Sequence, residues 1–185
     1  SAGAPTFRAL LAADLPFKLY SESISSPTNA SATGTNTVAI GSGSVASGTG
    51  TLAMGSGAKA SIFGQQAVAN GRFATDGDAQ HGTYVLRNIT SNATTTELYL
   101  DGVTATQRIV VPNNSVWTFT ILVAGRRTDT TGGGAGYRFD GVLRKDATAG
   151  STTLVGAVSK SVLGETNTAW NAAVTVNTTN GSLKV

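Results

Sequence analysis

A fourteen-residue repeat constrains the fold of this 185-residue chain more than any other feature. The rows ISSPTNASATGTNT, VAIGSGSVASGTGT, LAMGSGAKASIFGQ and QAVANGRFATDGDA begin at residues 24, 38, 52 and 66. Alanine recurs in two columns and glycine in a third, at positions 43, 57 and 71. A fixed period of this kind indicates stacked units. Fourteen residues are too few for a helical hairpin, but they suffice for two short strands and two turns. The repeat therefore predicts the coils of a β-solenoid.

Two rows of the repeat, VAI and LAM, place a small alanine between two large apolar residues. Neighbours in a strand point to opposite faces, so the alanines and the large residues are separated. A narrow coil has room only for small side chains, and Ala39 and Ala46 with their equivalents are expected inside it. Monomers avoid large exposed apolar patches, and other copies of the chain are the simplest cover. The residues predicted to form this interface are Val38, Ile40, Leu52 and Met54.

The rows VAIGSGSVASG and LAMGSGAKAS resemble the head repeats of trimeric autotransporter adhesins of the YadA type. The resemblance covers residues 24–79 and implies a short left-handed parallel β-roll with three chains side by side. The number of chains comes from the resemblance and not from the spacing. The first row departs from the pattern at Ser25 and Pro27, and the fourth has Ala69 where glycine is expected. We interpret these rows as irregular end caps.

Residues 1–23 form a separate junction segment. FRALLAADLP has helical spacing that ends at Pro16. The longer phrase APTFRALLAADLP resembles a junction common in bacteriophage tail fibres, which favours a fibre over a bacterial adhesin. The chain begins without methionine and ends in a fresh apolar alternation, so we expect a fragment of a longer chain that continues beyond Val185.

Residues 80–185 predict a second, antiparallel β domain, incomplete at its C-terminal end. SVWTFTILVAGRR and GYRFDGVLRK alternate with period two, and TYVLRNI, TELYLDG, QRIVVP, TTLVGAVSK and WNAAVTV add shorter candidates. Tyr137, Phe139 and Leu143 are expected to point inward, as are Trp117 and Trp170. Seven or eight strands joined by turns predict a β-sandwich or jelly roll. The fold class is therefore all-β, a roll followed by a sandwich, in an intertwined or side-by-side homotrimer.

The composition excludes several classes of protein. Charged residues make up 12% and apolar residues 40%, with a net charge of +3, which favours a turn-rich β protein over disorder. There is no cysteine for disulfides or thiolate metal sites. The cations are scattered and form no nucleic-acid groove. No apolar run approaches the roughly 20 residues of a membrane-spanning helix.

No pattern supports catalysis, a cofactor or a metal. The single histidine, His81, lies at the junction of the two domains without a local nucleophile, and we expect an exposed hinge or interface residue. The carboxylate pairs Asp76 with Asp78 and Glu97 with Asp101 are expected by chance. TTGGGAGYRF lacks the Lys-Ser/Thr of a phosphate loop and predicts a hairpin tip. Three residues flank that tip and suit recognition of sugars or anionic surfaces: Arg126, Arg127 and Tyr137.

Together these features predict a non-enzymatic, homotrimeric segment of a phage tail fibre in the virion, outside cells. Its partners would be other tail or baseplate proteins and a host polysaccharide or outer-membrane receptor. Three alternatives remain open: a bacterial trimeric autotransporter adhesin, a virion head fibre or decoration protein, and a tailspike depolymerase.

Overall fold

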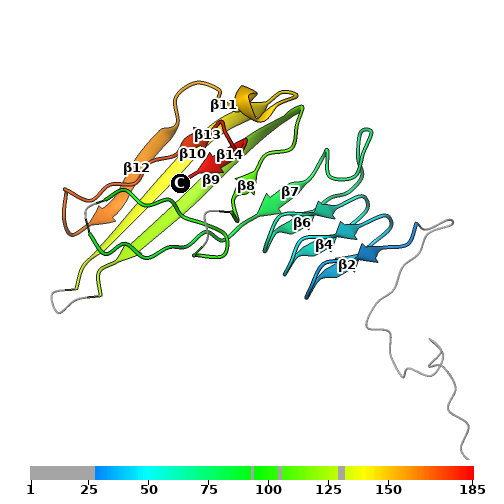
Figure 1. Ribbon diagram of the computed structural model, residues 1–185, viewed down its shortest axis with the longest axis horizontal. Helices are drawn as coiled ribbons and strands as arrows, with labels where there is room; N and C mark the ends of the chain where they lie inside the picture. Colours follow the sequence, from blue (N-terminus) through cyan, green and yellow to red (C-terminus); the bar gives the residue numbers. More distant parts are fainter. Residues whose placement is uncertain (1–27, 93, 104–105, 129–131) are drawn as a thin grey trace, which may run out of the picture.

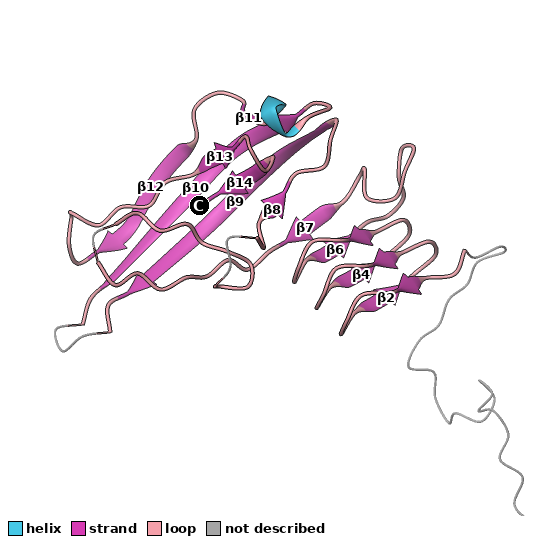
Figure 2. Ribbon diagram, viewed as in Figure 1, coloured by secondary structure: helices cyan, strands magenta, loops and turns pink. Residues whose placement is uncertain are grey.

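The computed structural model describes residues 28–92, 94–103, 106–128 and 132–185, and the predicted helical segment before residue 24 lies outside them. These residues form strands and one short 3₁₀ helix (Figures 1 and 2). The N-terminal strands are β1 (Ser31–Ala32), β2 (Val38–Ile40), β3 (Val45–Ala46), β4 (Leu52–Met54), β5 (Lys59–Ala60), β6 (Gln66–Val68) and β7 (His81–Thr83). The remaining elements are β8 (Ile109–Val110), β9 (Ser115–Arg126), β10 (Gly134–Lys145), η2 (Ala149–Ser151), β11 (Thr153–Leu154), β12 (Ser159–Glu165), β13 (Thr175–Asn177) and β14 (Ser182–Lys184).

The N-terminal strands build the predicted parallel roll. One sheet contains β1, β3 and β5, and the other contains β2, β4 and β6 with β7 at its end. The pairing steps by fourteen residues, since Val38 lies beside Leu52 and Leu52 lies beside Gln66. Figure 1 shows β2, β4 and β6 as successive rungs at one end of the molecule. β7 closes the second sheet by running antiparallel to β6. The predicted division at residues 79 and 80 therefore places β7 with the distal part, although β7 pairs with the roll.

The interior of the roll contains alanine and small polar residues. Four alanines at the predicted positions are fully buried, whereas Ala39 in the first complete rung is half-buried. The hydroxyls of Ser44 and Thr51 donate to the carbonyls of Gly41 and Gly48, at 2.9 and 2.8 Å, so buried polar groups are satisfied within their own turns. The predicted small-residue interior is confirmed. Its fully buried alanines in the strand columns are Ala46, Ala53, Ala60 and Ala67.

A glycine column follows the second sheet and explains the departure at Ala69. Gly55 has φ +95°, and a Cβ built on it would lie 2.0 Å from the Ala69 carbonyl oxygen of the next coil. A Cβ built on Gly41 would lie 2.9 Å from the carbonyl of Gly55 in the next coil. Ala69 stands in the last coil, where no further rung stacks on it. Glycine is thus required where another coil follows, and a side chain is tolerated where the stack ends.

The turn on the opposite side of each coil also needs glycine wherever another coil stacks on it, and it loses this glycine where the roll meets the distal domain. Gly34 and Gly48 each face the backbone of the next coil, within 2.4 and 2.8 Å of an added Cβ. One period later the corresponding residue is Ile62, followed by Phe63. Both side chains pack against the core of the distal domain. The roll therefore joins the distal domain through apolar contacts that its other turns have no room to make.

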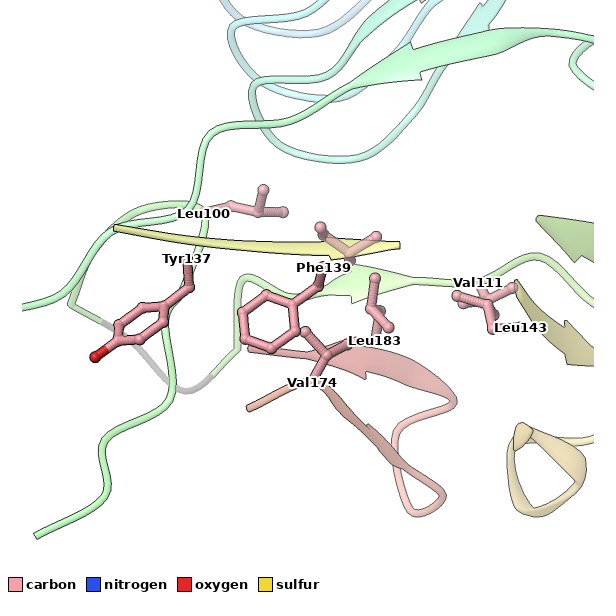
Figure 3. Packing of buried hydrophobic residues seen from close by; sticks show 8 residues of the cluster. Leu100, Val111, Tyr137, Phe139, Leu143, Val174 and Leu183 are labelled. Carbon is pink, nitrogen blue, oxygen red and sulfur yellow. The ribbon is translucent and has the colours of Figure 1, made fainter. Parts of the chain in front are cut away.

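The distal domain is a sandwich of two antiparallel sheets, as predicted. β9 and β10 form a hairpin in register from Arg126–Gly134 to Ser115–Lys145, and the other edge of β10 pairs with β12 and then β11. The second sheet has the order β13-β14-β8. Phe139 and Leu143 from β10 both belong to the core between the sheets, where Phe139 lies beside Leu183 from β14 and Leu143 lies beside Val111 (Figure 3). The predicted inward positions Tyr137, Phe139 and Leu143 are all buried.

Four of the shorter strand predictions differ from the structure. TYVLRNI and TELYLDG form no strand after β7 ends at Thr83. They share one isolated bridge, between Arg87 and Tyr99. TTLVGAVSK divides into β11 and β12 at Gly156, which has φ +77°. In WNAAVTV only the last residues enter β13, and 170–174 run beside the sheet without pairing. Alternation was present in all four segments, but a strand also needs a neighbouring edge that is free to pair.

Replacing Gly55 by alanine is expected to destabilise the roll more than replacing Gly50. Both residues have positive φ, which costs alanine about 1–2 kcal/mol. Nothing lies within 4 Å of a Cβ on Gly50, whereas Gly55 faces a backbone carbonyl that cannot rotate away. We expect the overlap to add about 1–3 kcal/mol for Gly55→Ala. Urea unfolding at one protein concentration measures both variants, and equal losses would contradict the stacking argument.

Tyr84 is expected to make stability decline at high pH. Its ring stacks on Trp117, with centroids 6.1 Å apart. Burial raises the pKa of Tyr84 to about 12, opposed by a hydrogen bond with Gln65. A raised phenol pKa contributes stability that is complete below the unfolded value near pH 10 and is lost as the pH rises through about 12. Tyr84→Phe should reduce both this loss and the phenolate absorbance change between pH 10 and 12. An unchanged absorbance change would contradict the assignment.

Candidate binding surfaces

The outer side of the β2-β4-β6 sheet is an apolar surface, which we call the apolar roll face. The parallel register places its side chains in two columns, one led by Val38 and the other by Ile40. Val38 is 50% exposed and Met54 43%, while Leu52 is half-buried. The sequence-predicted residues therefore lie together and outside the coil. The sequence analysis missed Val68, which continues the second column. The apolar roll face consists of Val38, Ile40, Leu52, Met54 and Val68.

His81 lies at the edge of the apolar roll face. It pairs with Val68 across β6 and β7, and the alternation of β7 leaves it exposed. The imidazole thus continues the column of Ile40 and Met54. The position agrees with an exposed junction residue, and its neighbours in this column are apolar.

The predicted receptor residues are only partly brought together. Arg126 ends β9 and Arg127 follows it, and both are exposed. The Arg127 amide donates to the Gly133 carbonyl at 2.9 Å, which closes the base of the hairpin loop. Tyr137 instead lies in the core, and its hydroxyl donates to Glu165 Oε2 at 2.9 Å. Burial and this carboxylate raise the pKa of Tyr137. The tip therefore offers the arginines but not the phenol.

The loop containing Asp76 and Asp78 uses its carboxylates internally. Asp78 accepts the amides of Phe73, Ala74 and Thr75 at 2.7–2.8 Å, and these hydrogen bonds, from Thr75 and Ala74 most strongly, lower its pKa. Asp76 pairs with Arg72. The carboxylates of this loop thus hold its shape. Within the described residues no group of three or more His, Cys, Asp or Glu could hold a metal ion.

Glu97 and Asp140 are also held by hydrogen bonds within their own parts of the fold. Glu97 accepts from Arg108 at 3.0 Å and from the Tyr99 hydroxyl at 3.2 Å. On the outer side of β10, Asp140 accepts from Arg138 and from Thr120. Arg138 and Thr120 lower the pKa of Asp140. These contacts give each carboxylate a structural role in its own sheet or loop.

A groove of about 310 Å³ opens beside β10 and β12. Its apolar floor includes Phe139, and Lys160 and Asn171 supply its polar side chains. The sequence analysis assigned Lys160 and Asn171 no role. Lys160 lies in an alternating strand and Asn171 in a loop, and no local motif connects them. The lining residues are Phe139, Val158, Lys160, Asn171, Ala172, Ala173 and Val174.

These observations define a class of protein: a repeat-built β-roll with an apolar outer face, joined to a β-sandwich that carries exposed arginines at a hairpin tip. The sequence model of the YadA head domain repeat matches residues 28–44 and 46–74, in two copies. The chain therefore carries adhesin-type head repeats in the segment that forms the roll. No curated protein and no solved structure matches the chain. Among the described residues, no helix is long and apolar enough to cross a membrane.

Proposed function

We propose that this chain is a non-enzymatic segment of a homotrimeric bacteriophage tail fibre that attaches the particle to a host surface. The roll supplies a stiff shaft and a contact between chains, and the distal sandwich presents the binding surface. Three tips on one shaft convert weak individual contacts into firm attachment. Other tail or baseplate proteins would hold the opposite end, and the fibre would act outside cells.

The apolar roll face is the main observation in support of assembly into a homotrimer. Its residues form two adjoining columns on one sheet, and the alanine-filled interior has no space to take them inward. An apolar surface of this continuity is what an interface between chains covers. The match to the YadA head repeat supports side-by-side packing of three chains. A three-fold arrangement would bring the apolar roll faces of neighbouring chains together around one axis.

The repeats favour a bacterial trimeric adhesin head as strongly as a phage fibre. The junction phrase APTFRALLAADLP, which precedes the described residues, supports the fibre. The two proteins would meet different surfaces, because a phage fibre binds bacteria and a bacterial adhesin binds the surface that its bacterium colonises. Binding of the labelled chain to bacterial and to animal cells therefore distinguishes them.

Acidic substitutions on the apolar roll face are expected to dissociate the assembly. The double variant Ile40→Glu and Met54→Glu would bury carboxylates in an apolar contact, which is strongly unfavourable without a partner. We expect the wild-type chain to have three times the monomer mass in sedimentation equilibrium, and the variant to have the monomer mass. Val155→Glu is the matched control, since Val155 is 49% exposed and lies outside this face. A monomeric wild-type chain would refute the assembly proposal.

Attachment is expected to depend on both the arginine tip and the number of chains. The variant Arg126→Ser and Arg127→Ser should bind bacterial cells more weakly than wild type but stay trimeric. The dissociated roll-face variant should lose about 10²–10⁴ in apparent affinity, because it loses multivalency. Arg72→Ser with Arg144→Ser is the control for charge, since each of these arginines is paired with an aspartate nearby in the sequence. Binding to animal cells alone would favour the adhesin. Release of oligosaccharides from bacterial polysaccharide would instead indicate a depolymerase.

A further inference from the structure

The groove beside β10 and β12 combines an apolar floor with a single positive charge. Phe139 and Val174 belong to the buried core, and Val158 is half-buried beside them. Lys160 is the only charged residue among those that line the groove. A volume of about 310 Å³ lies at the lower end of small-molecule sites, which run from about 300 to 1,000 Å³. The groove thus suits a ligand of one or two rings with an apolar face and a negative charge.

Aromatic rings hold the Lys160 ammonium at the groove. Its Nζ lies 4.7 Å from the centroid of the Tyr137 ring and 5.9 Å from that of Phe139. It also donates a hydrogen bond to Asn171 Oδ1 on the facing segment. Cation–π contacts and one amide restrict the position of the ammonium without neutralising it. Two of its three N–H groups remain for a ligand.

The surroundings of Lys160 leave its charge uncompensated. Glu165 is the carboxylate on the same strand, and it accepts from the Tyr137 hydroxyl. Within the described part of the chain, the ion pairs of Arg108, Arg138 and Arg144 each use a carboxylate, whereas Lys160 has only the amide of Asn171. The groove therefore contains an ammonium that has no ion-pair partner among the described residues.

The backbone beside Asn171 adds hydrogen-bonding groups. Residues 171–174 lie outside the strands and turns of the sheets. No backbone hydrogen bond joins Ala172 or Ala173 to any other described residue. Ala172 and Ala173 both line the groove, and their methyl side chains are too short to cover the adjoining backbone. Sugar hydroxyls require such donors and acceptors, arranged around an apolar surface for the C–H face of the ring.

We propose that this groove binds a carboxylate-bearing sugar residue of a surface glycan. The carboxylate would accept from Lys160 Nζ, the ring would lie against Phe139 and Val158, and hydroxyls would bond to the backbone at Ala172 and Ala173. The proposal rests on the proposed host-attachment function and names the ligand class. It adds a site on the side of the sandwich to the arginines at the tip.

A matched pair of probes tests the proposal on the full chain. Methyl β-D-glucuronide and methyl β-D-glucoside differ only in that a carboxylate replaces a hydroxymethyl group. We expect the glucuronide to bind at least about tenfold more tightly, as one charge-assisted hydrogen bond predicts. NMR titration should place its shifts on the amides of Lys160, Ala172 and Ala173. Equal affinity for the two probes, or no binding of the glucuronide, would overturn the proposal.

Substitution of Lys160 separates the site from the fold. Lys160→Met keeps the aliphatic stem against the rings and removes the charge, and it should reduce glucuronide affinity at least about tenfold. Lys59→Met removes a charge on the roll, away from the groove lining, and should leave affinity unchanged. If Lys160→Met binds the glucuronide as well as wild type while its amide spectrum shows a folded chain, the site is refuted. An equal loss in both variants would refute it as well.

Cell attachment distinguishes failure of this site from failure of the proposed function. A trimeric Lys160→Met variant that binds bacterial cells as well as wild type would refute the groove as a receptor site but leave attachment standing. A wild-type chain that binds the glucuronide with a Lys160-dependent affinity and attaches to no cell would support the site and refute the host-attachment role.

Discussion

The close parallel stacking of fourteen-residue coils is the constraint on which the rest of this structure depends. Each coil lies one strand spacing from the next, so its interior admits alanine and its turns admit glycine. The carbonyl of Ala69 lies where a side chain on Gly55 would begin. Large apolar residues within the roll's second sheet are consequently displaced to its outer face. A coil this narrow has no interior space for Ile40 or Met54, so packing creates the apolar roll face that the proposed assembly would cover.

At the end of the stack, the steric restriction on side chains in the turns is absent. Where no further coil follows, the turn carries Ile62 and Phe63 in place of glycine and threonine, and these side chains pack against the distal core. The joint thus forms where the steric restriction is lifted. Tyr84 and Trp117 stack within the same region, which links the roll to the long β9–β10 hairpin. These contacts hold the distal domain against the roll, as the proposed multivalent attachment would require.

The distal sandwich combines a buried core with an exposed edge at β12. β10 contributes buried residues along its length, while β12 remains exposed over most of its own. The unpaired segment 171–174 lies opposite, and the groove occupies the space beside them. Edge positions are where a sheet can offer both side chains and free backbone groups to a ligand. The inner side of the sandwich thus provides stability, and its edge is available for recognition.

The sequence by itself determined the features that depend on local periodicity. The repeat established the stacked coils and the outward position of Val38 and Met54, and alternation identified the hairpin and the inward face of Phe139 and Leu143. The sequence predicted Tyr137 both as an inward residue and as a receptor contact beside the hairpin tip. Only the tertiary structure shows that its side chain is buried in the core. The structure also decided that residues 84–89 and 96–102 share a single bridge, and that Lys160 meets Asn171. Those outcomes depend on which edges and surfaces meet across the chain. Alternation specifies the face on which a side chain lies, but it carries no information about the partner opposite.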